Sequence, residues 1–175
     1  VKTVNFGEPK YVGDPLNAVR IYNEKEVDEL VVFDIDATVK DTEPDYQLIS
    51  NLAAECRMPL CYGGGVRTIE HFEKIVRLGV EKVAVSAATI ENQHLITVAA
   101  KRIGSQSLVV VIDVKKTGIL RHYEVVTHNG SQRTGLDPSD FAARIADAGA
   151  GEIVVNSVDR DGEMSGYDFN LIDSI

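Results

Sequence analysis

The stretch that decides the fold is Gly149–Asp168, which reads Gly-Ala-Gly-Glu-Ile-Val-Val-Asn-Ser-Val-Asp-Arg-Asp-Gly-Glu-Met-Ser-Gly-Tyr-Asp, because the chain contains a second version of it. The run Glu152-Ile153-Val154-Val155 matches Glu29-Leu30-Val31-Val32, whose numbers are 123 lower. The same offset relates four further pairs: Asp159 and Asp36, Asp168 and Asp45, Asp137-Pro138 and Asp14-Pro15, and Leu171-Ile172 and Leu48-Ile49. An offset that holds without a gap over this length indicates an internal duplication.

Both copies follow the same order of expected elements. Each begins with an Asp-Pro that opens a helix, because the Asp caps free N–H groups and the Pro fits the first turn. A strand that begins with Glu, an acidic loop and a second helix follow. Between the copies we expect strand Leu60–Gly63, helix Thr68–Leu78, strand Lys82–Ser86, helix Gln93–Arg102 and strand Leu108–Val114. The strands are nearly continuous apolar runs, which is typical of a parallel sheet covered on both faces.

The duplication predicts a closed barrel. One period contains four strands, so two copies make eight, and the fold class we expect is α/β, a (β/α)₈ TIM barrel of two duplicated half-barrels. Such barrels take about 250 residues, whereas this sequence has 175. We therefore expect residues 1–175 to form a single, incomplete barrel domain that covers about strands two to six. The alternative is a complete, smaller α/β domain with an open sheet.

The composition is that of an ordinary globular protein, with 44% hydrophobic residues, 26% charged residues and a net charge of −9. An acidic chain without a Lys/Arg cluster argues against nucleic acid and membrane surfaces as partners. No apolar run reaches the ~20 residues of a membrane span, and we expect a cytoplasmic protein in which Cys56 and Cys61 are reduced. The four histidines are scattered, so the sequence predicts no metal site and no cofactor.

Small residues end two neighbouring strands, at the face where barrel enzymes place their active sites. The first strand ends in Gly63-Gly64-Gly65 and the second in Ser86-Ala87-Ala88. Glycines let a ligand approach the backbone and its N–H groups, and a phosphate suits such a turn beside a helix N-terminus. The pattern favours a phosphate site over a simple turn.

Carboxylates end two further strands. Asp113 is the polar residue near the end of the most apolar strand, where it is either a general acid/base or the partner of a neighbouring lysine. Asp34 either caps the next helix or faces the pocket, and Asp36 is expected to be a cap. Asn156-Ser157 ends the strand of the second copy, and the polar loop Asp159-Arg160-Asp161-Gly162 follows it. We expect this loop to form the second half's counterpart of the first site.

Two further features lie away from the glycine turn. Glu29, Lys82 and Glu152 each occupy the first position of a strand, in alternate strands, so they would share one layer of a barrel interior if they point inward; outward, they are solvated strand ends. The repetition of Glu29 as Glu152 favours the inward arrangement.

The segment Ile119–Thr127, followed by Asn129-Gly130, is typical of a hairpin and is expected to form a flap over the barrel mouth.

These motifs together resemble the cyclase subunit of imidazole glycerol phosphate synthase (HisF). The resemblance covers essentially the whole chain and rests on Asn5-Phe6, Gly13-Asp14-Pro15, Asp28-Glu29-Leu30, Gly63-Gly64-Gly65, Gly104-Ser105-Gln106, Asp113-Val114-Lys115-Lys116, Thr134-Gly135, Gly149-Ala150-Gly151-Glu152-Ile153, Asp159-Arg160-Asp161-Gly162 and Gly166-Tyr167-Asp168. It implies a barrel of two similar halves. A partner glutaminase (HisH-like) supplies ammonia at the barrel bottom, and the ammonia crosses to a bis-phosphorylated substrate at the top. The products are imidazole glycerol phosphate and an aminoimidazole carboxamide ribotide, in histidine biosynthesis.

The resemblance also implies roles for single residues. Asp113 matches the general acid/base of strand five, whose partner aspartate on strand one lies outside the sequence. One phosphate site matches Gly64, Gly65, Ser86 and Ala87, and part of the other matches Asp161 and Gly162. Asn156 is also assigned to substrate binding. The charged gate of the ammonia passage matches Glu29, Lys82 and Glu152, which supports the inward arrangement.

Five positions depart from the pattern of the histidine-pathway enzymes. Cys61-Tyr62 stands in place of Thr-Val, Ser86-Ala87 in place of Asn and a hydroxyl residue, and Asn156 in place of Thr. These changes weaken the first phosphate site and resemble a HisF-like branch associated with acetamidino-sugar formation in lipopolysaccharide biosynthesis. An ammonia-channelling subunit for amidation of a surface sugar is therefore an alternative function, and a non-catalytic barrel scaffold is a third.

Overall fold

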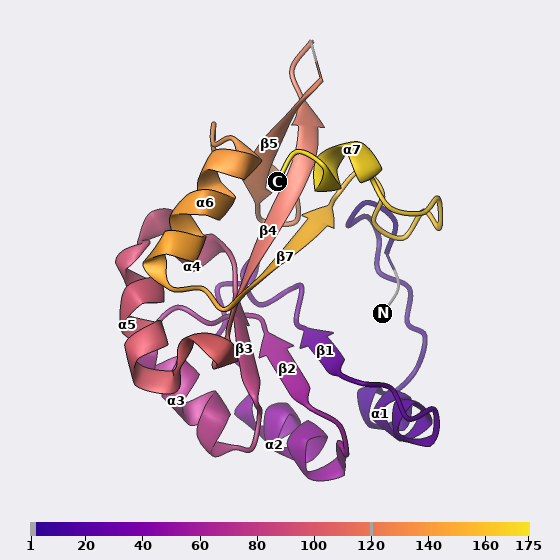
Figure 1. Cartoon of the computed structure of the whole chain (residues 1–175). Coiled ribbons are helices and arrows are strands. Elements are labelled where there is room, and N and C mark those ends of the chain that lie inside the picture. Colours follow the sequence, from indigo (N-terminus) through magenta and orange to yellow (C-terminus); the bar gives the residue numbers. More distant parts are fainter. Residues whose placement is uncertain (1–2, 120) are drawn as a thin grey trace.

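The computed structural model describes residues 3–119 and 121–175, so Leu120 of the expected Ile119–Thr127 segment lies outside the described residues. Helices and strands alternate along most of the chain (Figure 1). In chain order the elements are α1 (Pro15–Glu24), β1 (Leu30–Phe33), α2 (Tyr46–Glu55), β2 (Leu60–Gly63), α3 (Ile69–Arg77), β3 (Lys82–Val85), α4 (Ala87–Glu91), α5 (His94–Ile103), the 3₁₀ helix η1 (Ser105–Ser107), β4 (Leu108–Thr117), β5 (His122–Thr127), β6 (Gln132–Arg133), α6 (Pro138–Ala148), β7 (Glu152–Ser157) and α7 (Phe169–Ile172).

The sheet is built from parallel strands in the order β1-β2-β3-β4-β7. The long strand β4 pairs with β3 through its first residues and with β7 from Val109 to Val114. Its far end runs on beyond β3 and pairs with β5 in antiparallel fashion. Each parallel neighbour follows through a helical crossover, which is the βα arrangement that the sequence predicts.

The two faces of the sheet differ, and the difference identifies the barrel. Alternate residues of every parallel strand enter one large core, which includes Leu60, Val83, Leu108 and Val110, and the helices supply its other half. These helices lie along one side of the sheet (Figure 1). The opposite face carries only a small cluster of Cys61, Ala84 and Val109, with Val111 and Val154 against it. A doubly wound sheet would have helices on both faces, so the open-sheet alternative is wrong.

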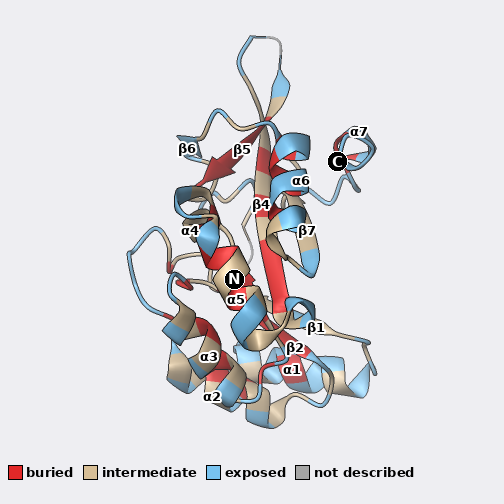
Figure 2. Cartoon of the chain, turned by 60° about the vertical axis from the view of Figure 1, so that its left-hand side comes forward, coloured by how far each residue is buried: buried red, intermediate tan, exposed pale blue. Residues whose placement is uncertain are grey.

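The inner face is less covered than the sequence pattern predicts. Phe33 of β1 points to this side and is 42% exposed, whereas β4 is buried along much of its length (Figure 2). In the described part of the chain, β1 and β7 are the outermost parallel strands, and each has one parallel neighbour. The parallel strands therefore form the curled part-barrel expected for strands two to six.

Helix caps repeat at the predicted offset. The carboxylate of Asp14 accepts hydrogen bonds from two N–H groups of α1, and Asp137 does the same at the start of α6. Asp45 accepts from Leu48 N at the start of α2, and Asp168 accepts from Leu171 N at the start of α7. The caps of Asp14 and Asp137 were predicted from the Asp-Pro pairs and are confirmed, and the structure adds the equivalent pair of caps, Asp45 and Asp168.

The segment expected as a flap is confirmed in part. Its described residues include β5, which pairs with β4 and, through the turn that contains Asn129-Gly130, with β6. The paired ends of β4 and β5 project beyond the body of the molecule, above the end of β7 (Figure 1). The base of the β4–β5 hairpin, Thr127–Asn129, turns back over the inner side of the sheet and lines the cavity described below. Only the base therefore lies at the mouth.

In residues 3–119 and 121–175, no helix is long and apolar enough to cross a membrane.

Candidate functional site

A cavity of about 770 Å³ opens at the carboxyl ends of the parallel strands. Its walls contain the glycine turn after β2, the start of α4 after β3, the polar end of β4 and the loop after β7. The structure brings together at this cavity all eight residues that the sequence assigned to acid/base chemistry or substrate binding: Gly64, Gly65, Ser86, Ala87, Asp113, Asn156, Asp161 and Gly162.

Asp113 is the carboxylate on the inner wall. The side-chain amide of Asn156 donates to its Oδ1 at 2.9 Å, from the facing position of β7. Burial raises the pKa of Asp113, the Asn156 hydrogen bond opposes this, and the nearby Asp161 carboxylate adds to the rise. Lys116, one of the two lysines that follow it, pairs with Asp168 instead. The alternative of an Asp113–lysine ion pair is therefore not supported, and the carboxylate faces the cavity.

The glycine turn after β2 brings the backbone close to the neighbouring loop. Gly64 and Gly65 have φ of +131° and +69°, which L side chains rarely adopt. A Cβ on Gly64 would lie 2.6 Å from the Cβ of Asp34, and a Cβ on Gly65 would lie 2.6 Å from the carbonyl oxygen of Thr42. Glycine is therefore required here on two grounds, the backbone conformation and the close approach of the loop after β1, and both glycines line the cavity.

The end of β3 offers fewer polar groups. Ser86 is the residue before α4, and its hydroxyl makes no capping hydrogen bond to that helix. Its carbonyl oxygen accepts from the Thr89 hydroxyl at 2.7 Å, which holds the first turn in place. Ala87 contributes only backbone, so any side-chain donor at this strand end comes from Ser86.

The loop after β7 is held by the N-terminal segment. Asn5 N donates to the carbonyl oxygen of Asp161 at 2.9 Å, and the Thr3 hydroxyl donates to the Asp161 carboxylate at 3.3 Å. Gly162 has φ of +72°, and a Cβ on it would collide with the carbonyl oxygen of Thr3. The first described residues thus fix the loop at the edge of the cavity.

At the opposite end of the strands the three charged residues meet. Lys82 Nζ donates to Glu29 at 2.9 Å and to Glu152 at 2.5 Å, and only 18% of the Lys82 side chain is exposed. The two carboxylates raise the pKa of Lys82. The inward arrangement is confirmed, with one difference of boundary, since β1 begins at Leu30 and Glu29 directly precedes it.

Between the charged cluster and the cavity the inner face is small and apolar. Cys61, Ala84 and Val109 form it, with Val111 and Val154. Burial raises the pKa of the Cys61 thiol to about 12, so the thiol is protonated near neutral pH. Among the described residues, no group of three His, Cys, Asp or Glu side chains has the arrangement of a metal site.

One sequence assignment was wrong and two residues were missed. Asp34, not Asp36, caps the loop after β1, because its carboxylate accepts from the N–H groups of Asp36 and Ala37. Asp36 pairs with Lys40 instead. Arg67 and His128 also line the cavity. The position of Arg67, two residues after the glycine turn, was a visible signal, whereas no pattern in the sequence singles out His128.

The fold and the site define a class: a (β/α)-barrel protein with a polar cavity at the carboxyl ends of its strands and a charged cluster at their amino ends. Comparison with known proteins gives the family. The family model described as "Histidine biosynthesis protein" matches residues 1–175. The chain is 53% identical over 175 residues to a putative imidazole glycerol phosphate synthase subunit HisF of Leptospira borgpetersenii, and the match covers all of this chain and 69% of the relative.

Two further relatives agree. A putative imidazole glycerol phosphate synthase subunit, hisF3, of Vibrio vulnificus is 54% identical over 172 residues, which are 98% of this chain and 66% of the relative. The imidazole glycerol phosphate synthase subunit HisF of Alkaliphilus metalliredigens is 40% identical over 171 residues, which are 98% of this chain and 68% of the relative. The chain belongs to the histidine biosynthesis protein family, within its HisF group, and spans about two thirds of the length of these relatives.

Proposed function

We propose that this protein is the cyclase subunit of an imidazole glycerol phosphate synthase, a lyase that uses ammonia from a partner glutaminase. Residues 1–175 are then one incomplete barrel domain of that subunit, working in the cytoplasm. Membership of the HisF group supports the assignment. The observation that carries the proposal is the pairing of Asp113 with Asn156 in a cavity whose two sides are the glycine turn and the Asp161-Gly162 loop.

The cavity provides for a substrate with two phosphoryl groups. One group would lie against Gly64 and Gly65, with Ser86 and Ala87 across from it, where the left-handed turn exposes backbone N–H groups. The other would lie at the Asp161-Gly162 loop. The two binding regions lie on different sides of Asp113, so the reacting part of the substrate would be held over that carboxylate.

Asp113 is suited to proton transfer in the ring closure. A carboxylate that is largely removed from water holds its proton more tightly, so it accepts and returns a proton more readily near the working pH. The Asn156 amide fixes the orientation of the carboxylate by donating to one oxygen. Among the described residues, Asn156 is the side-chain hydrogen-bond partner of Asp113 and occupies Oδ1, so we assign the second oxygen, Oδ2, to the substrate.

The opposite end fits the delivery of ammonia. The glutaminase would dock at the amino ends of the strands, beside Glu29, Lys82 and Glu152. Past this cluster, the inner face of Cys61, Ala84 and Val109 offers no charge. An ammonium ion would lose its hydration there and find no opposite charge, which costs free energy. Neutral ammonia carries no charge, so the cost of removing it from water is much smaller. We therefore assign neutral ammonia to the passage.

The test is turnover of the bis-phosphorylated ribulosyl substrate by the intact protein, with ammonium salt at a pH above 8 as the nitrogen source. We expect loss of substrate with the wild-type protein and loss of activity in Asp113→Asn. Because the amide is of nearly the same size and still accepts from Asn156, the variant is expected to stay folded, which a thermal melt checks. Equal rates in the two proteins would remove Asp113 from the chemistry.

A second candidate is an ammonia-channelling subunit that serves the amidation of a surface sugar. Ser86-Ala87 favours it, because Ser86 stands where the histidine-pathway enzymes have Asn and Ala87 has no side-chain donor. Asn156, in place of Thr, is a further departure from those enzymes. In this case the intact protein would not consume the ribulosyl substrate but would activate its glutaminase on mixing. Absence of both activities would leave the third candidate, a barrel scaffold.

A further inference from the structure

The charge of the cavity is unfavourable for a phosphorylated substrate. Five carboxylates line it: those of Asp34, Asp41, Glu91, Asp113 and Asp161. Among the described residues of the lining, Arg67 carries the one permanent positive charge, since His128 is charged only when protonated. A phosphate monoester bears up to two negative charges near neutral pH. The glycine turn can offer backbone N–H dipoles but no full positive charge. A nearby cation would therefore decide whether the phosphoryl group binds.

Arg67 lies beside that turn. Its Nη2 donates to the carbonyl oxygen of Thr42 at 3.3 Å. The same oxygen lies 2.6 Å from the position that a Cβ on Gly65 would take. The guanidinium and the glycine turn therefore border one carbonyl group, and the backbone of Arg67 is anchored there because its N–H donates to His71 Nδ1 at 3.3 Å.

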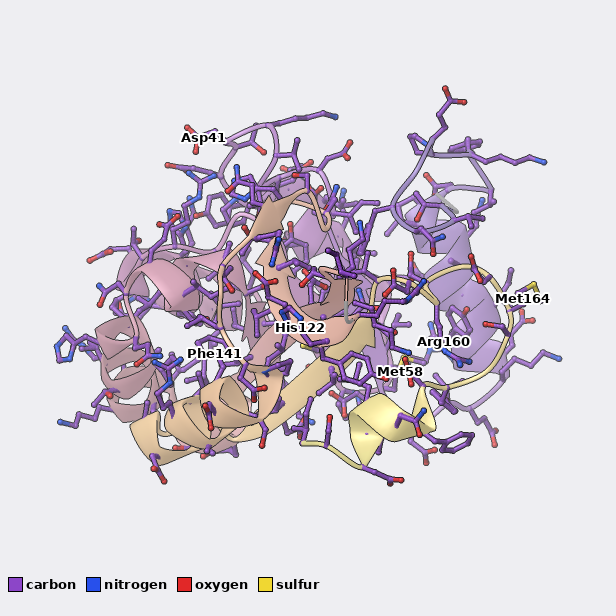
Figure 3. The ribbon with its side chains drawn as sticks, turned by 90° about the horizontal axis from the view of Figure 1, so that it is seen from above. Asp41, Met58, His122, Phe141, Arg160 and Met164 are labelled. Atoms are coloured by element: carbon purple, nitrogen blue, oxygen red, sulfur yellow. The ribbon has the colours of Figure 1, made fainter. Side chains whose placement is uncertain are left out.

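The present partner of Arg67 is weakly held. Its Nη1 pairs with the carboxylate of Asp41, of which 85% is exposed, while 38% of the Arg67 side chain is exposed. Exposed ion pairs contribute little to stability, because water competes with them. Asp41 lies at the edge of the molecule, on its own loop (Figure 3). The guanidinium can therefore exchange this carboxylate for another anion at small cost.

We propose that Arg67 is the phosphate-binding side chain of the first subsite, and that Asp41 holds it there when the subsite is empty. On binding, the guanidinium would release Asp41 and donate two parallel hydrogen bonds to phosphoryl oxygens, a geometry that arginine forms and lysine does not. This compensates for Ala87, which has no donor. The proposal rests on the proposed function in one respect, that a phosphoryl group binds at Gly64 and Gly65.

The experiment is a titration of the intact protein, labelled with ¹⁵N-glycine, with inorganic phosphate followed by NMR. The amide of Gly65 reports the first subsite and the amide of Gly162 reports the second. We expect Arg67→Gln to weaken the response of Gly65 by about tenfold or more, and Arg67→Lys to recover part of it. Asp41→Asn removes the competing carboxylate and is expected to tighten it. Arg77→Gln is the matched control, since Arg77 pairs with Glu73 on α3 and does not line the cavity.

The outcomes separate the two claims. Loss of the Gly65 response in Arg67→Gln, with the Gly162 response and the thermal melt unchanged, supports the role of Arg67. An equal Gly65 response in wild type and Arg67→Gln overturns that role and leaves the phosphate subsite in place. A wild-type protein whose Gly65 amide does not respond to phosphate overturns the subsite itself, and with it this part of the proposed function.

Discussion

The two copies of the duplicated segment, residues 14–49 and 137–172, have the same order of helix, strand, loop and helix. They differ in the side chains that hold the loop after the strand. Asp41 and Met164 are equivalent positions, and both are left-handed, with φ of +54° and +57°. In each loop an arginine donates to the equivalent carbonyl group, Arg67 to Thr42 O and Arg160 to Ser165 O. The duplication therefore preserved the path of the chain while the arginine came from a different place in each half.

The copies differ most at the second cap. Asp45 is exposed and caps α2 alone, whereas Asp168 has only 4% of its side chain exposed and is surrounded by Tyr123, Lys116 and Arg160. Arg160 and Met164 lie on one side of the molecule and Asp41 on another (Figure 3). The second loop is thus tied to the β4–β5 hairpin through a buried carboxylate, whereas Arg67 ties the first loop through an exposed ion pair and one hydrogen bond to Thr42 O. This difference identifies the first loop as the one that can change partners.

The largest effect is expected at Asp113, on the strand between the copies. Asp113→Asn should lower ammonia-driven turnover by about a hundredfold or more, the usual contribution of a general acid or base. Its effect on stability should have the opposite sign. Because the folded-state pKa of Asp113 is raised, the ionised carboxylate destabilises the fold near neutral pH, and the amide should add about 1 kcal/mol there.

That gain has a defined pH dependence. As the pH falls through the raised folded-state pKa towards the ordinary value of 3.8, the wild-type carboxylate takes up a proton in the folded state and the advantage of the variant disappears. Urea unfolding of both proteins across this range measures it. A variant that is both less active and less stable at neutral pH would show that Asp113 has a structural role instead.

The next largest effect separates the two caps. Asp168→Asn should cost about 2 kcal/mol, because it leaves two cations without their carboxylate, although both still reach water. Asp45→Asn should cost less than about 1 kcal/mol, since asparagine caps nearly as well as aspartate. Chemical unfolding gives both values. Equal costs would mean that the surroundings of Asp168 add nothing to the cap and that the two halves are held alike.

A smaller, pH-dependent effect is expected in the hairpin. Glu124 is buried on β5, and its carboxylate accepts hydrogen bonds from Arg133 at 2.7 Å and from Thr117 at 2.5 Å. These two hydrogen bonds, with the larger contribution from Arg133, lower the pKa of Glu124 from 4.5 to about 2. A depressed folded-state pKa means that the stabilisation is complete above 4.5 and is lost as the pH falls towards 2. The stability difference between wild type and Glu124→Gln should shrink across this window, and a constant difference would contradict the assignment.

The smallest effect is expected at the first loop. Arg67→Gln and Asp41→Asn should each change the free energy of unfolding by less than about 1 kcal/mol, as for other exposed pairs. Thermal and urea unfolding of the two variants provide the measurement. A larger loss would mean that Arg67 holds the fold rather than a ligand, and that the first loop is as firmly fixed as the second.

The sequence predicted what depends on local chemistry and on repetition. The caps of Asp14 and Asp137 followed from the two Asp-Pro pairs, and the meeting of Glu29, Lys82 and Glu152 followed from their places at the starts of alternate strands. The choice of Asp34 rather than Asp36 as the cap and the Arg67–Asp41 pair could not be predicted, because both depend on the path of a loop with a left-handed residue. The surroundings of Asp168 combine residues of β4, β5 and the last loop, and only the tertiary fold brings these together.

We propose above all that the carboxyl end of this sheet binds a substrate with two phosphoryl groups across Asp113. The decisive measurement is a crystal structure of the intact protein with the bis-phosphorylated substrate. We expect one phosphoryl group at Gly64 and Gly65, in contact with Arg67, the other at the Asp161-Gly162 loop, and the reacting atoms over Asp113. Phosphoryl groups bound at the Glu29–Lys82–Glu152 end, or only on the outside of the hairpin, would contradict it.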